Sequence, residues 1–296
     1  MTTSSNRPVV VGVDGTRASQ GALRYAVEEA RRLGVPLEAV HVVPDHLDVS
    51  PLVVLSAEDR SALGSRIVRD AEDDVADLAP DVDTVGWVHH GSRPAQLAKA
   101  AARGSALVVG RDERPLVERL LRGDTATGVA ARAAVPVVVV PAAWIPQAAS
   151  HGVVLVGLKS PAVAPPVLDD AFRLADRLDA TLVVLHAWWV PSEYADVIAS
   201  RVAVEEWRHR ATVEAETLLQ EWRDRYPDVK VEIRVVHGHP GPMLVDASAG
   251  ADVVVIGRRA HGVPAAVHLG GTARTVLRAA ACPVRVVPPR PAERDI

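Results

Sequence analysis

The chain has 296 residues, of which 48% are hydrophobic and 24% charged, with a formal net charge of −4. This balance is typical of an ordinary globular protein and argues against a nucleic-acid partner recognised through bulk positive charge. One cysteine, Cys282, excludes an intrachain disulfide and fits a reducing compartment. The N-terminus is polar, and no apolar run approaches the roughly 18 residues that span a bilayer, so we expect a soluble cytoplasmic protein without a membrane partner.

Strands and helices alternate along the first half of the chain. Short runs of β-branched residues are typical of buried parallel strands, and apolar residues three or four apart are typical of helices. Strands are predicted over residues 9–13, 37–43, 82–90, 106–110 and 135–141. Helices are predicted between them, over about 23–33, 67–78, 94–103 and 124–133. Gly34 suits the end of the first helix, and Pro80 ends the second.

The second half repeats the first. A shift of 145 positions places His41 on His186, and a shift of 147 places Gly110 on Gly257. The repeated strands are predicted over residues 152–158, 180–187, 229–238, 251–257 and 282–288. We therefore predict two domains, 1–143 and 152–296, joined by a linker over 144–151.

A long helix precedes residue 227 in the second half. Its apolar residues recur every three or four positions, at Trp207, Ala211, Ala215, Leu218 and Trp222. A stripe of this kind is typical of core packing. We therefore expect these side chains to be buried and assign them no ligand role.

The alternation predicts parallel sheets with helices on both faces. Ligands of such sheets bind at the carboxyl ends of the strands. In the first half these ends lie at residues 13–15 and 110–113, and in the second at 158–160 and 257–262.

The loop after the fourth strand has the same glycine spacing in both halves. Gly110 and Gly123 are 13 positions apart, and so are Gly257 and Gly270. A glycine after a strand lets the backbone approach a ligand, and a helix start offers N–H groups to an anion. The spacing therefore favours a phosphate site. The alternative is a pair of tight turns that need positive φ.

These features resemble tandem proteins of the universal stress protein family. The resemblance is carried by VVVGVDGTRASQGAL at 9–23, by the two glycine loops, and by the closing strands VPVVVVP and CPVRVVP. It implies two Rossmann-like α/β domains of the adenine nucleotide alpha hydrolase type, each with a five-stranded, mainly parallel sheet. It also implies pairing through the last strands, within the chain or in a homodimer.

The family resemblance further implies binding of ATP, alone or with Mg²⁺, through the pattern G-x2-G-x9-G-[ST], with an Asp after the first strand near the adenosine. In domain 1 the corresponding nucleotide-binding residues are Asp14, Gly15, Val42, Gly110, Arg111, Gly123 and Thr125. In domain 2 they are Gly157, Ala187, Gly257, Arg258, Arg259, His261, Gly262, Gly270, Gly271 and Thr272.

The phosphate pattern is incomplete in both domains. In domain 1, Glu113 replaces the middle glycine and Asp124 stands at the Ser/Thr place. In domain 2 the same places hold Ala260 and Gly271, and Lys159 replaces the Asp after the first strand. Since a carboxylate repels phosphate, domain 2 is predicted to hold phosphates better.

Two acidic residues of domain 1 have structural alternatives. Asp14 either accepts hydrogen bonds from an adenosine or shapes a turn with Gly15. Asp124 is also a good helix N-cap.

The sequence predicts a binding and regulatory module rather than an enzyme. A scaffold with degenerate nucleotide pockets, acting through protein contacts, is the alternative, and a slow ATP hydrolase is a third reading. There is no GxxxxGK[ST] loop, and no local spacing supports paired catalytic carboxylates. The histidines of VHHG and VHGH lack further ligands at metal-site spacing, so no metal site is expected. His41 and His186 are interpreted as structural because they are paired.

Overall fold

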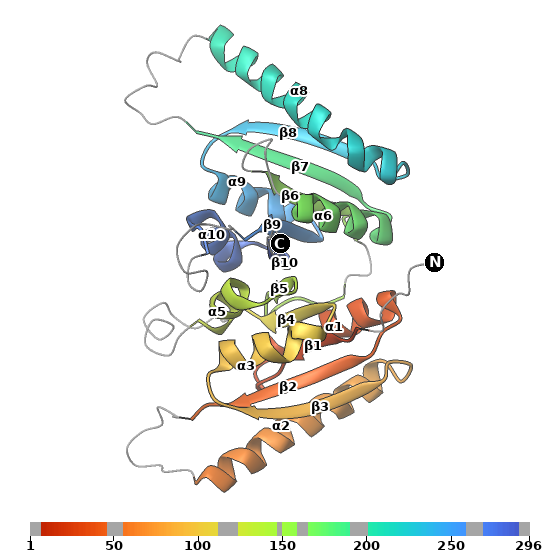
Figure 1. Cartoon of the computed structure of the whole chain (residues 1–296), viewed down its shortest axis with the longest axis vertical. Helices are drawn as coiled ribbons and strands as arrows, with labels where there is room; N and C mark the ends of the chain where they lie inside the picture. The colour runs from red at the N-terminus through yellow and green to blue at the C-terminus, as the bar shows by residue number, and fades with distance from the viewer. Residues whose placement is uncertain are drawn as a thin grey trace, which may run out of the picture. The chain divides into compact units, whose positions relative to one another are not determined.

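The computed structural model describes residues 7–45, 56–111, 124–146, 150–158, 165–189, 201–258 and 269–289, with only the backbone for 201–204. The chain forms two compact units (Figure 1). Unit 1 holds strands β1 to β5, and unit 2 holds β6 to β10. The predicted linker limits of 144 and 151 stay a prediction.

Unit 1 is a five-stranded parallel sheet with the strand order β3-β2-β1-β4-β5. The predicted alternation of strands and helices is confirmed. The elements are β1 (Val9–Gly12), α1 (Arg17–Leu33), β2 (Leu37–Val43), α2 (Ala57–Leu78), β3 (Thr84–His90), α3 (Arg93–Ala100), η1 (Ala101–Arg103), β4 (Ala106–Gly110), α5 (Thr125–Arg132) and β5 (Val137–Val140).

Unit 2 repeats this plan, with the strand order β10-β9-β6-β7-β8 and parallel pairing throughout. The elements are β6 (Val153–Leu158), α6 (Pro165–Leu178), β7 (Thr181–Trp188), α8 (Arg201–Arg225), β8 (Val231–His237), α9 (Pro240–Ala247), η3 (Ser248–Gly250), β9 (Val253–Gly257), α10 (Gly271–Ala279) and β10 (Val284–Val287).

Local chemistry sets the helix limits in unit 1. Helix α1 starts after Thr16, whose hydroxyl accepts a hydrogen bond from the N–H of Ser19, and it ends at Gly34 in the left-handed region at φ 62°. Helix α2 starts well before the predicted residue 67. A capping box between Ser56 and Asp59 satisfies its first N–H groups.

The inner strands of each sheet are largely buried because helices cover both faces, whereas the edge strands β3 and β8 alternate between half-buried and exposed residues. In unit 1, α1 and α2 pack on the face that carries Val9 and Val11. Helices α3 and α5 pack against each other, and they also contact β2 and β5 respectively. The carboxyl ends of all the strands in a unit meet at one edge, which is where ligands of such sheets bind.

The predicted burial of the apolar stripe on the long helix α8 holds only for part of the helix. Its C-terminal half packs on the sheet of unit 2, where Ala215 and Trp222 are 3% and 5% exposed. Trp207, however, is 45% exposed, so its predicted burial is wrong. Residues 205–210 are all exposed, which indicates that this end of the helix extends beyond the covered face.

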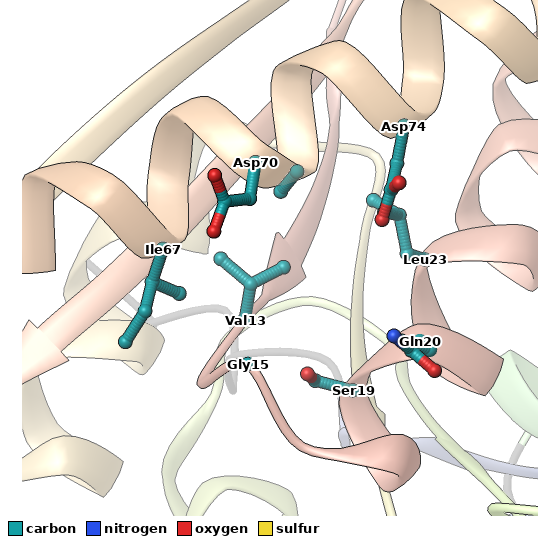
Figure 2. A pocket seen from close by; sticks show the side chains of 9 residues that line it. Val13, Gly15, Ser19, Gln20, Leu23, Ile67, Asp70 and Asp74 are labelled. Carbon is teal, nitrogen blue, oxygen red and sulfur yellow. The ribbon is translucent and has the colours of Figure 1, made fainter.

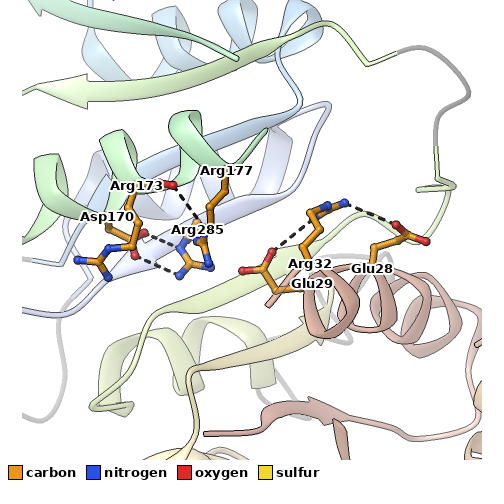
Figure 3. A network of polar contacts seen from close by, with 7 residues as sticks. All are labelled: Glu28, Glu29, Arg32, Asp170, Arg173, Arg177 and Arg285. Atoms are coloured by element: carbon orange, nitrogen blue, oxygen red, sulfur yellow. Dashed lines mark hydrogen bonds and ion pairs between the residues drawn. The ribbon is translucent and has the colours of Figure 1, made fainter. Parts of the chain in front are cut away.

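A buried ion pair joins α6 to β10 in unit 2. The guanidinium of Arg285 donates from Nε and Nη2 to the two carboxylate oxygens of Asp170, at 2.5 and 3.1 Å (Figure 3). Asp170 is 6% and Arg285 4% exposed. The repeat places Tyr25 and Val138 at these positions in unit 1, both of them buried. The fold itself therefore does not require an ion pair here.

The carboxylate of Asp252, next to β9, accepts hydrogen bonds from the residues at the start of β6. Asp252 accepts hydrogen bonds from the Ser150 hydroxyl at 2.7 Å and from the N–H groups of His151 and Val153 at 2.8 and 2.9 Å. Partial burial raises the pKa of Asp252, but these hydrogen bonds together outweigh burial and hold the pKa below its ordinary value. A carboxyl group with such a lowered pKa stabilises the fold above its unfolded pKa, and this stability is lost as the pH falls through the folded pKa.

We expect Asp252→Asn to lower the free energy of unfolding by about 1 kcal/mol near neutral pH, because charge-assisted hydrogen bonds are lost at a partly exposed site. This difference should shrink as the pH falls from about 4, the ordinary pKa of aspartate, through the lower folded pKa of Asp252, because the wild-type carboxyl group then also becomes neutral. Urea denaturation of the wild type and the variant, near neutral pH and at low pH, measures this difference in the free energy of unfolding. A difference that does not change with pH would show that the Asp252 charge is unimportant.

Candidate functional site at the carboxyl edges of the two sheets

The turn after β1 is shaped by the side chain of Asp14. Its Oδ1 accepts hydrogen bonds from the backbone N–H and the hydroxyl of Thr16, at 3.0 and 2.5 Å. Gly15 follows with φ +74°, a conformation that favours glycine. The turn alternative for Asp14 is therefore confirmed, and its contact with an adenosine stays a prediction. Asp14 is also exposed, and Oδ2 makes no hydrogen bond to any residue that the structure describes, so a ligand could reach that oxygen.

The two repeated histidines make the same contact in both units. Nδ1 of His41 lies 2.8 Å from the carbonyl oxygen of Val13, and Nδ1 of His186 lies 3.2 Å from that of Leu158. Since a carbonyl only accepts, Nδ1 must carry the proton. Burial lowers the pKa of His41 and outweighs the hydrogen bond to Val13, which raises it. Each histidine fixes the end of the first strand of its unit, as the structural interpretation predicted.

Close packing explains three of the predicted ligand glycines. A Cβ atom on Gly110 would lie 2.3 Å from the carbonyl oxygen of Ala18, in the first turn of α1. On Gly257 it would lie 2.8 Å from a methyl group of Val167. On Gly157 it would lie 2.8 Å from a methyl group of Leu244. None of these glycines has positive φ, so the tight-turn alternative does not apply to Gly110 or Gly257.

The helices that follow the fourth strands begin differently in the two units. In α5, Asp124 is the N-cap, and its carboxylate accepts from the N–H and the hydroxyl of Thr127 at 3.1 and 2.7 Å. The predicted capping role of Asp124 is confirmed. In α10, Gly270 is the N-cap, and among the residues that the structure describes no side chain makes a cap hydrogen bond there. Gly271 and Thr272 are the first residues of α10, as Thr125 is of α5.

Two arginines follow the fourth strands at equivalent positions. The backbone N–H of Arg111 donates to Val140, and that of Arg258 donates to Val287, at 2.7 and 2.8 Å. Burial lowers the pKa of the half-buried Arg258 guanidinium. This charge therefore stands at the ligand edge of unit 2, partly withdrawn from water.

The remaining predicted site residues divide into two groups. Val42 and Ala187 lie buried in β2 and β7, near the carboxyl ends of these strands. Seven others lie outside the described residues: Glu113, Gly123, Lys159, Arg259, Ala260, His261 and Gly262.

A cavity of unit 1 contains two carboxylates, Asp70 and Asp74, that the sequence did not single out. It lies between α1 and α2 beside the turn at Gly15, as Figure 2 shows. Val13, Leu23 and Ile67 supply apolar surface, and Asp70 and Asp74 add two carboxylates. Their spacing of four residues on α2 is the only sequence signal for this pair. The negative charge makes the cavity unfavourable for a phosphate.

Among the described residues, no group of three or more His, Cys, Asp or Glu side chains is placed to hold a metal ion. Within the same residues, no helix is both long and apolar enough to cross a membrane.

The amino-acid sequence matches the model of the Universal stress protein family twice, over residues 5–141 and 151–288. A universal stress protein of Mycobacterium tuberculosis is 28% identical over 312 residues, which cover 97% of this chain and 98% of the relative. One from Mycolicibacterium smegmatis is 28% identical over 288 residues, covering 95% and 97%. The crystal structure of a universal stress protein from Archaeoglobus fulgidus superposes with a TM-score of 0.68 at 19% identity, covering 96% and 97%.

The fold and the repeated contacts at its ligand edges define a tandem α/β protein of Rossmann-like architecture. Together with the two matches to the family model, they show that the chain belongs to the universal stress protein family. The fold predicted from the sequence is thereby confirmed. The predicted pairing through last strands and the cytoplasmic location stay predictions.

Proposed function

We propose that this protein is an ATP-binding regulatory module in which unit 2 holds the phosphates. The observation that carries the proposal is the N-terminus of α10, where no side chain of the described residues caps the first N–H groups. These groups have no partner inside a helix, and they stand at the positive end of its dipole, so they favour an anion. In unit 1, the Asp124 carboxylate already takes this place.

Arg258 supports phosphate binding in unit 2. It directly follows β9, which pairs with β6 and β10 in the middle of the ligand edge. Its guanidinium stays charged near neutral pH, even though burial lowers its pKa, because arginine titrates far above that range. A charge-assisted hydrogen bond to phosphate contributes roughly 1.5–3 kcal/mol.

Electrostatic repulsion disfavours phosphates in unit 1. A carboxylate about 4 Å from a phosphate charge costs on the order of 4 kcal/mol at an effective dielectric constant near 20. Asp124 stands at the helix start where a phosphate would bind, and Asp70 and Asp74 add negative charge at the neighbouring cavity. For unit 1 we propose only the nucleoside contact, through the Oδ2 atom of Asp14.

The nucleotide is proposed as a ligand rather than as a substrate that is turned over. The proposal is supported by the sequence, which contains no recognisable catalytic motif. A second function, that of a scaffold acting through protein contacts, is favoured by unit 1 alone. There, packing explains Gly110 and helix capping explains Asp124, so neither residue requires a nucleotide.

The test is to give α10 the cap that α5 already has. We expect Gly270→Asp to weaken ATP binding by at least about tenfold, because its carboxylate would occupy the helix N-terminus and repel phosphate. Isothermal titration calorimetry with ATP, with and without Mg²⁺, measures the affinity.

Gly270→Asn is the matched control, since asparagine caps a helix as well as aspartate but carries no charge. It should retain clearly more ATP affinity than Gly270→Asp. Equal affinities for wild type and Gly270→Asp would contradict the assignment to unit 2. Absence of ATP binding by the wild-type protein would favour the scaffold.

A further inference from the structure

An aromatic cluster occupies the carboxyl edge of unit 2, at the ends of β7 and β8. The rings of Trp188 and His237 have centroids 4.4 Å apart, and those of Trp188 and Trp207 lie 5.8 Å apart. Next along the chain, Trp189 stacks on His239 with centroids 4.4 Å apart and an angle of 28° between the rings. Trp189 and Trp207 are 48% and 45% exposed. Large aromatic surface is thus presented to solvent at a ligand edge.

The repeat shows that the fold does not need this cluster. Unit 1 has Val43 and Pro44 at the positions of Trp188 and Trp189, and Ser92 at that of His239. Both units nevertheless close the edge with the same backbone contact, in which the N–H of a glycine donates to the last residue of the second strand. Gly91 donates to Val43 at 3.0 Å, and Gly238 donates to Trp188 at 2.9 Å. The two units therefore share this backbone contact, and Trp188 and Trp189 are particular to unit 2.

From this geometry we propose that Trp189, supported by His239 and Trp188, is a stacking platform for the base of a bound nucleotide. A planar heterocycle gains dispersion and π contacts on an indole face whatever its hydrogen-bonding pattern. The adjoining His237 and His239 offer ring nitrogens that can donate to or accept from the edge of a base. The cluster can therefore contact both the flat face of a nucleobase and its hydrogen-bonding edge.

The platform lies close enough to the proposed phosphate site for one nucleotide to reach both. The order β9-β6-β7 places the end of β7 two strands from that of β9, about 10 Å along the edge. A nucleotide with its phosphates at α10 could therefore extend its base toward β7. This inference rests on the proposed function for the identity of the ligand, whereas the platform itself rests on the aromatic contacts.

The platform and the phosphate site can be tested separately with three probes. ATP has both parts, adenosine has only the base and sugar, and inorganic triphosphate has only the phosphates. We expect Trp189→Leu to weaken ATP and adenosine binding by roughly tenfold, the usual loss when an aromatic partner of a base is removed. Triphosphate affinity should stay unchanged.

Calorimetry measures the affinities for all three probes, because it does not depend on the tryptophan that the variant removes. Trp87→Leu is the matched control, because Trp87 lies in β3 of unit 1 and is similarly exposed, at 50%. It should bind all three probes as the wild type does. If Trp189→Leu binds adenosine and ATP as tightly as the wild type, or if the wild type does not bind adenosine, the platform is ruled out. Failure of both ATP and triphosphate to bind the wild type would instead contradict the proposed function.

Discussion

Asp170→Ala is expected to destabilise the protein by about 3–5 kcal/mol, because it removes the carboxylate that pairs with the buried guanidinium of Arg285. Arg285 is 4% exposed, and both of its hydrogen bonds to Asp170 would be lost. Water cannot readily replace the carboxylate at such a depth, so the buried charge pays a large desolvation penalty. Chemical denaturation monitored by circular dichroism measures the loss.

The matched control removes both charges. Asp170→Leu combined with Arg285→Met should be much closer to wild type than Asp170→Ala, since a buried ion pair can often be replaced by apolar residues of similar volume. Unit 1 is a precedent in the same fold, because Tyr25 and Val138 occupy the equivalent positions and both belong to its hydrophobic core. A double variant as unstable as Asp170→Ala would show that packing, rather than the guanidinium charge left without this carboxylate, accounts for the loss.

The repeat made much of the fold predictable from the sequence. Strands such as Val9–Gly12 and Val137–Val140 are short apolar runs buried on both faces, and this pattern identifies them without long-range information. The pairing of His41 with His186 predicted a structural role, and both make the same contact to a backbone carbonyl. Periodicity works here because each local pattern agrees with the burial that the sheet imposes.

Features that depend on distant contacts were not predictable. Asp170 and Arg285 are separated by 115 positions, so no local pattern indicates their ion pair. Trp207 has the spacing of a core residue but lies beyond the part of α8 that the sheet covers. The stack of Trp189 on His239 likewise depends on where two strands end in space.

The glycines of the candidate site show most clearly what a sequence pattern leaves open. Gly110 fits a ligand-binding pattern, yet in the structure a Cβ atom there would approach the carbonyl oxygen of Ala18 to 2.3 Å and its carbon to 2.5 Å. The same glycine therefore fits both a nucleotide loop and a tight contact between β4 and α1. These two roles predict different consequences for one substitution.

We expect Gly110→Ala to destabilise the protein by about 3 kcal/mol or more, because α1 must move away from β4 to admit the methyl group. The atoms that clash belong to the backbone, so no side-chain rotation can relieve them. Thermal and urea denaturation of the protein without nucleotide measure this loss. If Gly110 served only to let a ligand approach, the ligand-free variant would be as stable as the wild type and would lose only nucleotide affinity.

Alanine substitutions at two further glycines serve as controls for the stability loss expected of Gly110→Ala. Gly257→Ala, at the equivalent position in unit 2, should cost only about 1 kcal/mol, since its Cβ would meet a methyl group of Val167 at 2.8 Å and side chains adjust more easily than backbone. Gly250→Ala should be nearly neutral, because nothing lies within 4 Å of the added atom. The expected order, Gly110 above Gly257 above Gly250, follows from packing alone. Equal losses at all three positions would mean that a general effect of replacing glycine, rather than the contact with Ala18, sets the stability of this edge.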